Sequence, residues 1–90
     1  MIIVSYDISD TKLRTKFSKF LKRFGFRLQY SVFQLENSKH ILDNIVTEIK
    51  NIYEPQFKQT DSVMIFIISS SCKIIRMGYA KNDESDVIII

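Results

Sequence analysis

The sequence predicts an α+β fold in which one antiparallel sheet carries two helices on a single face. Its 90 residues suit one domain spanning residues 1–90, because domains usually hold roughly 100–200 residues. Two stretches repeat apolar residues at helical spacing, and they lie among about five short β-prone runs. The chain has only two glycines, which is too few for a glycine-rich phosphate loop. This order of elements is typical of ferredoxin-like sandwiches.

The first quarter of the chain predicts a strand followed by a helix. Residues 2–6 are rich in β-branched and aromatic side chains and predict a strand that ends at Asp7. Asp10 is expected to cap the helix that follows, since Asp is among the best N-caps. Gly25 is expected to end that helix as its C′ residue. The apolar face of the helix consists of Leu13, Phe17, Phe20, Leu21 and Phe24.

Residues 26–35 predict an interrupted β segment. Apolar and polar residues alternate over residues 26–32, and the alternation slips where Phe33 follows Val32. A strand cannot change its buried face without a bulge or bend. We therefore expect a break near residues 31–33 that splits the segment into two short strands.

The second half of the chain predicts one more helix and further strands. Ser38 can cap the helix, and Pro55 limits its continuation. Residues 63–68 are apolar on both faces, which suits a central strand. Residues 72–77 predict another strand, and residues 87–90 form a short β-prone run after a polar loop. The helix has as its apolar face Ile41, Leu42, Ile45, Val46, Ile49, Ile52 and Tyr53.

Composition excludes several classes of protein. An apolar fraction of 46% with charges of both signs argues against disorder. No apolar run approaches the roughly 20 residues that span a bilayer. The single Cys72 excludes an internal disulfide and a multi-cysteine zinc site. We expect a compact cytoplasmic domain that does not bind membranes.

The net charge of +3 conceals a strongly basic segment. Residues 11–27 contain seven basic residues and no acid, and such a concentrated field attracts polyanions. A solvated helix face is the alternative explanation. The residues expected to contact nucleic acid are Lys12, Arg14, Lys16, Lys19, Arg23 and Arg27.

Residues with catalytic chemistry are few. The lone His40 and the lone Cys72 lack partners that would mark covalent catalysis. Asp7 ends the first strand, where functional groups are common. One carboxylate cannot hold Mg²⁺ firmly, because that ion wants octahedral oxygen ligation. Two copies of Asp7 facing each other across a two-fold axis would supply a second carboxylate, which joins metal binding to dimerisation.

Two sequence blocks stand on either side of the basic amphipathic helix. Residues 5–10 read SYDISD, and residues 21–33 read LKRFGFRLQYSVF. These blocks resemble the CRISPR-associated Cas2 family, whose pattern is YDI-x-D, such a helix, and then G-x-R-[VL]-Q-x-S-V-F. The strong match covers about the first third of the chain, and the rest agrees in length and element order.

The resemblance implies a ferredoxin-like homodimer that acts in spacer acquisition. The resemblance thus implies an endonuclease that uses Mg²⁺ (or Mn²⁺) to cut single-stranded RNA or double-stranded DNA. It also implies a dimeric scaffold of an integrase complex with Cas1. The acidic metal position of the family falls on Asp7. Lys16 stands where some relatives have Arg. The other active-site and substrate-proximal positions fall on Tyr6, Arg14, Arg27, Ser31 and Phe33.

The residues themselves agree with parts of this expectation. The absence of a histidine base suits hydrolysis by water that a metal ion activates. Arg14 and Arg27 are expected to hold the scissile phosphate and offset its developing charge. The terminal run is expected to add to the partner protomer's sheet, with pairing in its own sheet as the alternative. That dimer interface consists of Val87, Ile88, Ile89 and Ile90.

Three other functions fit parts of the same sequence. A nucleic-acid-binding scaffold would leave Asp7 catalytically idle. A toxin ribonuclease of the VapD type has a related architecture, and neighbouring CRISPR repeats would exclude it. An acylphosphatase-like enzyme needs a phosphate loop that Gly25 and Gly78 are poorly placed to form.

Overall fold

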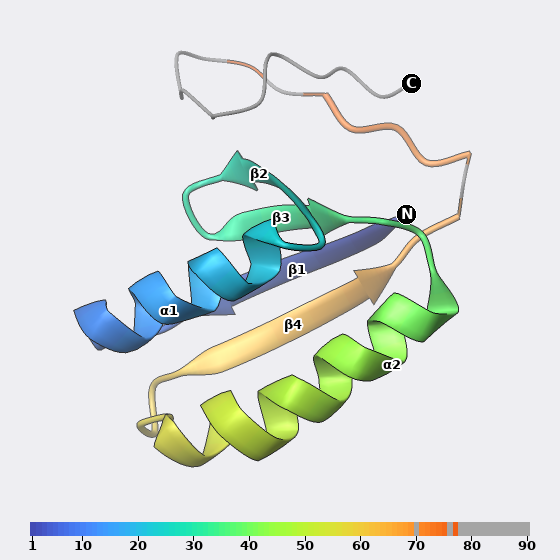
Figure 1. Cartoon of the computed structure of the whole chain (residues 1–90). Coiled ribbons are helices and arrows are strands. Elements are labelled where there is room, and N and C mark those ends of the chain that lie inside the picture. Colours follow the sequence, from blue (N-terminus) through green and yellow to red (C-terminus); the bar gives the residue numbers. More distant parts are fainter. Residues whose placement is uncertain (70, 76, 78–90) are drawn as a thin grey trace.

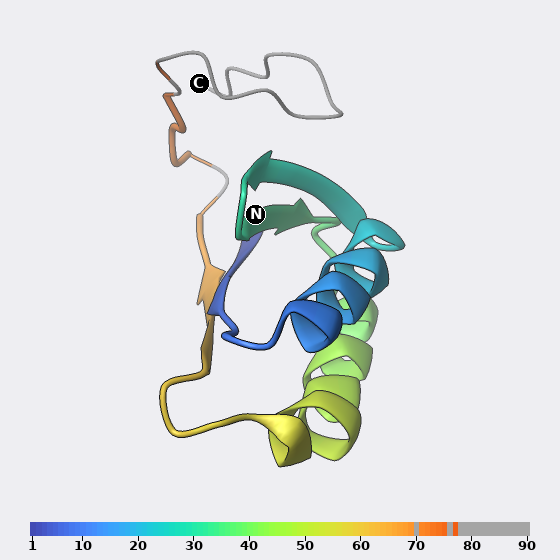
Figure 2. The same cartoon turned by 90° about the vertical axis from the view of Figure 1, so that its left-hand side faces the viewer.

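A computed structural model describes residues 1–69, 71–75 and 77. Over these residues the sheet has the order β2-β3-β1-β4, and all neighbouring strands are antiparallel. Both α-helices cover the same face of this sheet (Figures 1 and 2). The predicted α+β class and ferredoxin-like order are therefore confirmed. The elements are β1 (Ile2–Asp7), α1 (Thr11–Lys22), β2 (Gly25–Gln29), β3 (Val32–Leu35), α2 (Lys39–Glu48), the π-helical η1 (Ile49–Tyr53), the 3-10 helical η2 (Glu54–Gln56) and β4 (Ser62–Ile67).

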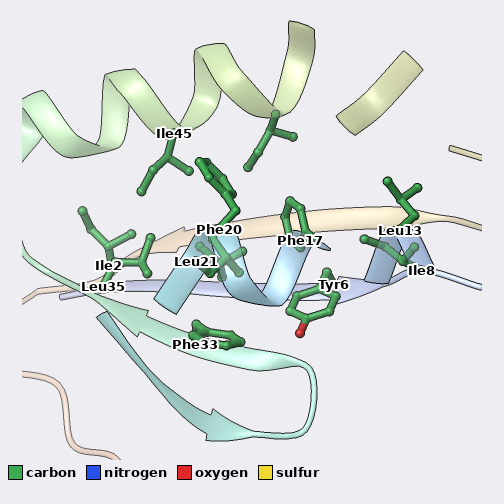
Figure 3. Close-up of a cluster of buried hydrophobic side chains, with 12 residues drawn as sticks. Ile2, Tyr6, Ile8, Leu13, Phe17, Phe20, Leu21, Phe33, Leu35 and Ile45 are labelled. Carbon is green, nitrogen blue, oxygen red and sulfur yellow. The ribbon is translucent and has the colours of Figure 1, made fainter. Parts of the chain in front are cut away.

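The core lies between the helices and β1, the strand that pairs with both β3 and β4. Phe17 of α1, Phe33 of β3 and Ile45 of α2 are fully buried there, and Figure 3 shows Ile45 next to Phe20 between α2 and the sheet. Burial of such side chains is the main favourable contribution to folding. In the described part of the chain, neither α-helix has the length and apolar run that a bilayer crossing requires.

Both helix starts lie where the sequence predicts them. The Asp10 carboxylate accepts a hydrogen bond from the Leu13 amide at 2.8 Å, and the Ser38 hydroxyl accepts one from the Ile41 amide at 3.3 Å. Each cap satisfies a backbone donor that has no partner within the first turn. The helical course after Ser38 also continues past Glu48 through η1 and η2 to Gln56.

The predicted role of Gly25 is wrong. α1 ends at Lys22 with Arg23 as its C-cap, and Gly25 is the first residue of β2. A Cβ at Gly25 would overlap the carbonyl oxygen of Gln34 and lie 2.7 Å from the Leu35 Cα. Glycine is needed here because the two strands approach too closely for any side chain.

Replacing Gly25 by alanine is expected to destabilise the protein by about 1–3 kcal/mol, because the strand backbones must move apart to admit the methyl group. Urea unfolding followed by circular dichroism measures this loss. The exposed Asn51 offers a control, since Asn51→Ala adds no atom to a packed region. An unchanged unfolding midpoint for Gly25→Ala would contradict the close approach.

The break predicted in residues 26–35 is confirmed. β2 ends at Gln29 and β3 begins at Val32, so the turn occupies Tyr30 and Ser31, at the start of the predicted region. The pairing register also shifts between Arg27 and Gln29. This β-bulge absorbs the change of phase that the sequence pattern shows.

The prediction that residues 63–68 form a central strand is wrong in its position. β4 lies at the edge of the sheet and pairs with β1 alone among the described residues. On the face away from the helices, Met64 is 57% exposed and Phe66 is 42% exposed. Apolar residues on both faces of a strand indicate that both faces are to be covered, but they do not say by which chain.

The strand predicted over residues 72–77 is also wrong. In the described part of this segment, Ile74 forms an isolated β-bridge and no strand is present. After β4 the described residues of this segment lie around a hollow on the face away from the helices, together with Ile3, Leu28 and Val32, and β propensity alone does not make a strand. Gly78, the polar loop and the expected strand of residues 87–90 lie outside the described residues.

Candidate active site

Asp7 is an exposed carboxylate at the end of β1. Val4 and Tyr6 point into the core beneath the helices, so strand alternation places Asp7 on the opposite face of the sheet. Within the described residues, no hydrogen bond or ion pair engages its side chain. Asp7 is therefore available to a ligand.

The donor set at Asp7 fits an open magnesium site rather than a closed cage. The described residues contain no group of three or more His, Cys, Asp or Glu side chains that could hold a metal ion. Mg²⁺ usually keeps several waters and binds through one or two carboxylates together with substrate phosphates. Asp7, without a side-chain partner among the described residues, supplies one such carboxylate, and a second copy of the chain would supply the other.

Tyr6, Arg27 and Phe33 form one packed cluster on the helical side of the sheet, opposite to the face from which Asp7 projects. Tyr6 is only 4% exposed and Phe33 is fully buried, with their ring centroids 6.3 Å apart. The Arg27 guanidinium carbon lies 5.2 Å from the centre of the Phe33 ring, a cation–π arrangement. The structure thus places Tyr6 and Phe33 beneath Arg27, where they support it rather than face solvent.

In this cluster the Tyr6 hydroxyl has a hydrogen-bond partner, whereas the Arg27 Nε has none among the described residues. Burial raises the pKa of the Tyr6 phenol, and the nearby Arg27 charge opposes this only in part. The phenol therefore stays protonated at neutral pH, and its hydroxyl donates to the Tyr30 carbonyl at 3.5 Å. The Arg27 Nε is buried without a hydrogen-bond partner among the described residues. Such an orphaned donor is costly and suits a position that an anionic ligand completes.

The β2–β3 turn brings Ser31 to the same end of the sheet. The backbone amide of Tyr6 donates to the Ser31 carbonyl at 3.1 Å, which ties the turn to the end of β1. The Arg14 guanidinium lies 5.9 Å from the centre of the exposed Tyr30 ring. Its other contacts are to the loop after β1, where it donates to the Ile8 carbonyl at 2.9 Å. The structure therefore links Tyr6, Arg14, Arg27, Ser31 and Phe33 through the β2–β3 turn, whereas the Asp7 side chain projects from the other face of the sheet.

The remaining basic residues form a separate surface on α1, which we call the lysine stripe. Lys12, Lys16 and Lys19 are exposed and, within the described residues, make no ion pair. Arg23 continues the stripe and lies over the Phe24 ring at 5.3 Å. The helix turns its buried residues, among them Phe17 and Leu21, toward the sheet. The stripe thus lies on the helical side of the molecule, whereas Asp7 points from the face away from the helices.

The sequence patterns did not predict the contact between Ser9 and Asp61 in this region. The Asp61 carboxylate, just before β4, accepts hydrogen bonds from both the amide and the hydroxyl of Ser9. The two residues are 52 positions apart, and Asp61 lies in a polar stretch that predicts only a loop. No local signal in the sequence reveals this contact.

The sequence matches a known protein family and its members. The family model described as CRISPR associated protein Cas2 matches residues 1–74. The CRISPR-associated endoribonuclease Cas2 2 of Methanospirillum hungatei is 34% identical over 98% of this chain and 97% of its own.

Two solved structures share the fold. A hypothetical protein, TT1823, from Thermus thermophilus superimposes with a TM-score of 0.73 at 24% identity, over 89% of this chain and 92% of that one. Cas2 from Streptococcus pyogenes superimposes with a TM-score of 0.65 at 20% identity, over 78% of this chain and 87% of that one. Together with the shared order of elements, the matched residues and the full-length relative show that this chain belongs to the CRISPR-associated Cas2 family.

Proposed function

We propose that this chain is a cytoplasmic endonuclease of CRISPR spacer acquisition that uses Mg²⁺ or Mn²⁺ to hydrolyse phosphodiester bonds of RNA or DNA. The observation that carries the proposal is the Asp7 carboxylate, which is exposed and without a partner in the described chain. Arg27, whose Nε has no partner among the described residues, packs over Phe33 on the opposite, helical side of the sheet. An exposed carboxylate suits the binding of a metal ion, and a guanidinium suits the binding of a phosphate.

Each residue of the cluster has a distinct part. Asp7 would hold the metal ion, which when bound polarises a phosphate and makes water a stronger nucleophile. Arg27 presents a planar fork that fits a phosphate, and the Phe33 ring beneath it fixes the plane of that fork. Tyr6 keeps its proton and stays tied to the β2–β3 turn, so that it orients the turn carrying Ser31. Arg14 donates hydrogen bonds to the carbonyls of the loop after β1.

The sheet face away from the helices supports a homodimer. Residues after β4 cover part of it, and Ile3 and Leu28 are buried there, but Met64 and Phe66 stay exposed beside an apolar hollow of about 590 Å³. A contiguous apolar surface of this kind is typical of a protein interface. Asp7 points from the same face, so a two-fold axis through it would bring the carboxylates of two copies toward each other.

The open edge of β4 supports the proposed strand exchange. In the described chain this edge is unpaired, and Ile67 at its end is 71% exposed. A hollow of about 420 Å³ lies alongside, between β4 and α2, and its lining includes Leu42 and Val46. Addition of residues 87–90 from a second copy would satisfy the edge and fill the hollow.

A nuclease assay of the wild-type protein tests the metal requirement. RNA and double-stranded DNA are each incubated with the protein in Mg²⁺, in Mn²⁺ and in EDTA. We expect cleavage of at least one substrate with either ion and none in EDTA. Full cleavage in EDTA would contradict the metal-dependent mechanism. Neighbouring CRISPR repeats in the genome would separate this protein from a toxin ribonuclease of the VapD type.

The lysine stripe is proposed to bind the nucleic-acid backbone. Replacing Lys12, Lys16 and Lys19 together by glutamine is expected to weaken binding and flatten its salt dependence. The slope of log affinity against log salt should fall by about 0.7–0.9 for each phosphate that the protein no longer neutralises. Binding measured across a range of salt concentrations gives this slope.

A matched variant controls for the change in net charge. Lys39, Lys50 and Lys73 lie outside α1, and their replacement by glutamine removes the same three charges. This control should keep the wild-type slope, because these lysines are not expected to meet the nucleic-acid backbone. Equal slopes for the two variants would mean that the stripe serves solubility only.

A scaffold without catalysis is the second candidate function. The lysine stripe and Asp7 lie on opposite sides of the sheet, so a duplex can follow the stripe without reaching Asp7. In this alternative the dimer bridges Cas1 subunits during integration, and Asp7 is idle. An integration assay with Cas1 and an Asp7 variant separates the two functions, because only the nuclease proposal requires the carboxylate.

A further inference from the structure

Asp61 is the most heavily hydrogen-bonded carboxylate among the described side chains. Its Oδ1 accepts the Ser9 amide at 2.9 Å and the Ser9 hydroxyl at 3.0 Å. Its Oδ2 accepts the Lys58 amide at 2.9 Å, while its own amide donates to the Lys58 carbonyl at 3.0 Å. Asp61 therefore closes the turn before β4 with one oxygen and reaches the loop after β1 with the other.

The loop that Asp61 reaches is the one that follows Asp7. Ser9 is two residues beyond Asp7, and Ile8 between them is buried. On its other side the same loop is held by Arg14, which donates to the carbonyls of Ile8 at 2.9 Å and Ser9 at 3.5 Å. Asp61 thus accepts hydrogen bonds from Ser9, and Arg14 donates hydrogen bonds to carbonyls of the same loop. The loop is fixed from two directions.

Asp61 is also joined to Asp7 through the sheet. Asp7 pairs with Ser62, the residue after Asp61, in the register of β1 and β4. A contact between Asp61 and Ser9 therefore closes a small ring of backbone that contains Asp7. Closing this ring restricts the backbone angles at the point from which the Asp7 side chain projects.

We propose that Asp61 is a positioning residue that holds the Asp7 carboxylate in place for metal binding. This inference rests on the proposed function, because it assumes that Asp7 is the metal ligand. Asp7 has no side-chain partner of its own in the described chain, so its position depends on its backbone. Groups that orient a metal ligand commonly change metal affinity by about 10–100-fold when they are removed.

The bonds to Asp61 are of the strong, charge-assisted type. Hydrogen bonds from the Lys58 and Ser9 amides lower the pKa of the Asp61 carboxyl below its usual value. A carboxyl with a lowered pKa in the folded state is fully ionised at neutral pH, and its bonds weaken only when the pH falls through that lowered pKa. The clamp is therefore intact wherever an enzyme of this kind is assayed near neutrality.

Asp61→Asn is the test variant, and Asp43→Asn is its control. An asparagine keeps the shape of the side chain, but one of its two terminal groups is an NH₂. This group donates hydrogen bonds, so it cannot accept the backbone amide that the replaced oxygen accepts. Asp43 is exposed on α2 and pairs only with Lys39 among the described residues, so its variant makes the same charge change far from the loop.

The first measurement is amide hydrogen exchange of Ser9 in the metal-free protein. Exchange at Ser9 is expected to quicken about tenfold in Asp61→Asn, because the acceptor of its amide is removed or weakened. It should stay at the wild-type rate in Asp43→Asn.

The second measurement is the Mn²⁺ concentration that half-broadens the Asp7 amide resonance. It is expected to rise about 10–100-fold in Asp61→Asn and to stay unchanged in Asp43→Asn. If Asp61→Asn does not fold, Ser9→Ala removes the hydroxyl bond alone and should give a smaller shift in the same direction.

The outcomes separate the two proposals. Unchanged Ser9 exchange, or an Mn²⁺ midpoint equal to that of Asp43→Asn, would overturn the role of Asp61. Absence of broadening in the wild type would instead overturn the metal site itself. Normal Mn²⁺ binding without any cleavage of RNA or DNA would overturn the nuclease proposal and leave the positioning role supported.

Discussion

Replacing Asp7 by asparagine is expected to reduce metal-dependent cleavage about a hundredfold or more, since several kcal/mol of charge stabilisation would disappear and each 1.36 kcal/mol is about tenfold in rate. The fold should be unaffected. Asp7 is exposed and has no hydrogen bond or ion pair with the described residues, so its removal breaks no structural contact. Cleavage of RNA and DNA in Mg²⁺, with thermal unfolding of the same samples, measures both effects.

The control for this experiment is Asp43→Asn, which removes an exposed carboxylate from α2. It should cleave at the wild-type rate. Asp7→Asn should also bind nucleic acid with nearly wild-type affinity, because the lysine stripe lies on the other side of the sheet. If Asp7→Asn cleaves as fast as Asp43→Asn, Asp7 is not the metal ligand. If neither they nor the wild type cleave but all three bind, the scaffold alternative is favoured.

Deleting residues 86–90 is expected to convert the proposed dimer to a monomer or to insoluble protein. These residues lie outside the described part of the chain, and the expectation rests on the surface that they are proposed to cover. The β4 edge is open in the described chain, and Ile67 beside it is largely exposed. Burial of apolar surface contributes about 25 cal/mol per Å², and exchange duplicates it by symmetry. Activity that needs two Asp7 residues should disappear together with the dimer.

Sedimentation of the truncated and full-length proteins measures this change. A substitution at the acceptor edge offers an independent test. Ile67→Lys places a charge on the open edge of β4, which opposes pairing with another strand. Ile52→Lys is the matched control, because Ile52 is 51% exposed on η1, away from that edge. A soluble, fully dimeric truncation, or equal dimerisation of the two lysine variants, would exclude strand exchange.

Features that depend on neighbouring residues could be predicted from the amino-acid sequence. Asp10 and Ser38 cap the two helices as predicted, since a cap needs only the backbone amide three residues later. The spacing of Leu13, Phe17 and Leu21 predicts the buried face of α1. The slipped alternation near residue 32 predicts the break between β2 and β3. The position of the carboxylate at the end of β1 is equally local, because it follows from where the apolar run stops.

Features that depend on contacts between distant residues could not be predicted in this way. Gly25 serves a close approach between β2 and β3 rather than a helix end. Tyr6 and Phe33, expected near the substrate, are buried beneath the Arg27 guanidinium. The contact between Asp61 and Ser9 joins residues 52 positions apart. Strand alternation and helical spacing state which side chains share a face, but not what the rest of the chain brings against that face. The edge position of β4 has the same origin, because pairing order follows from how the helices cross the sheet.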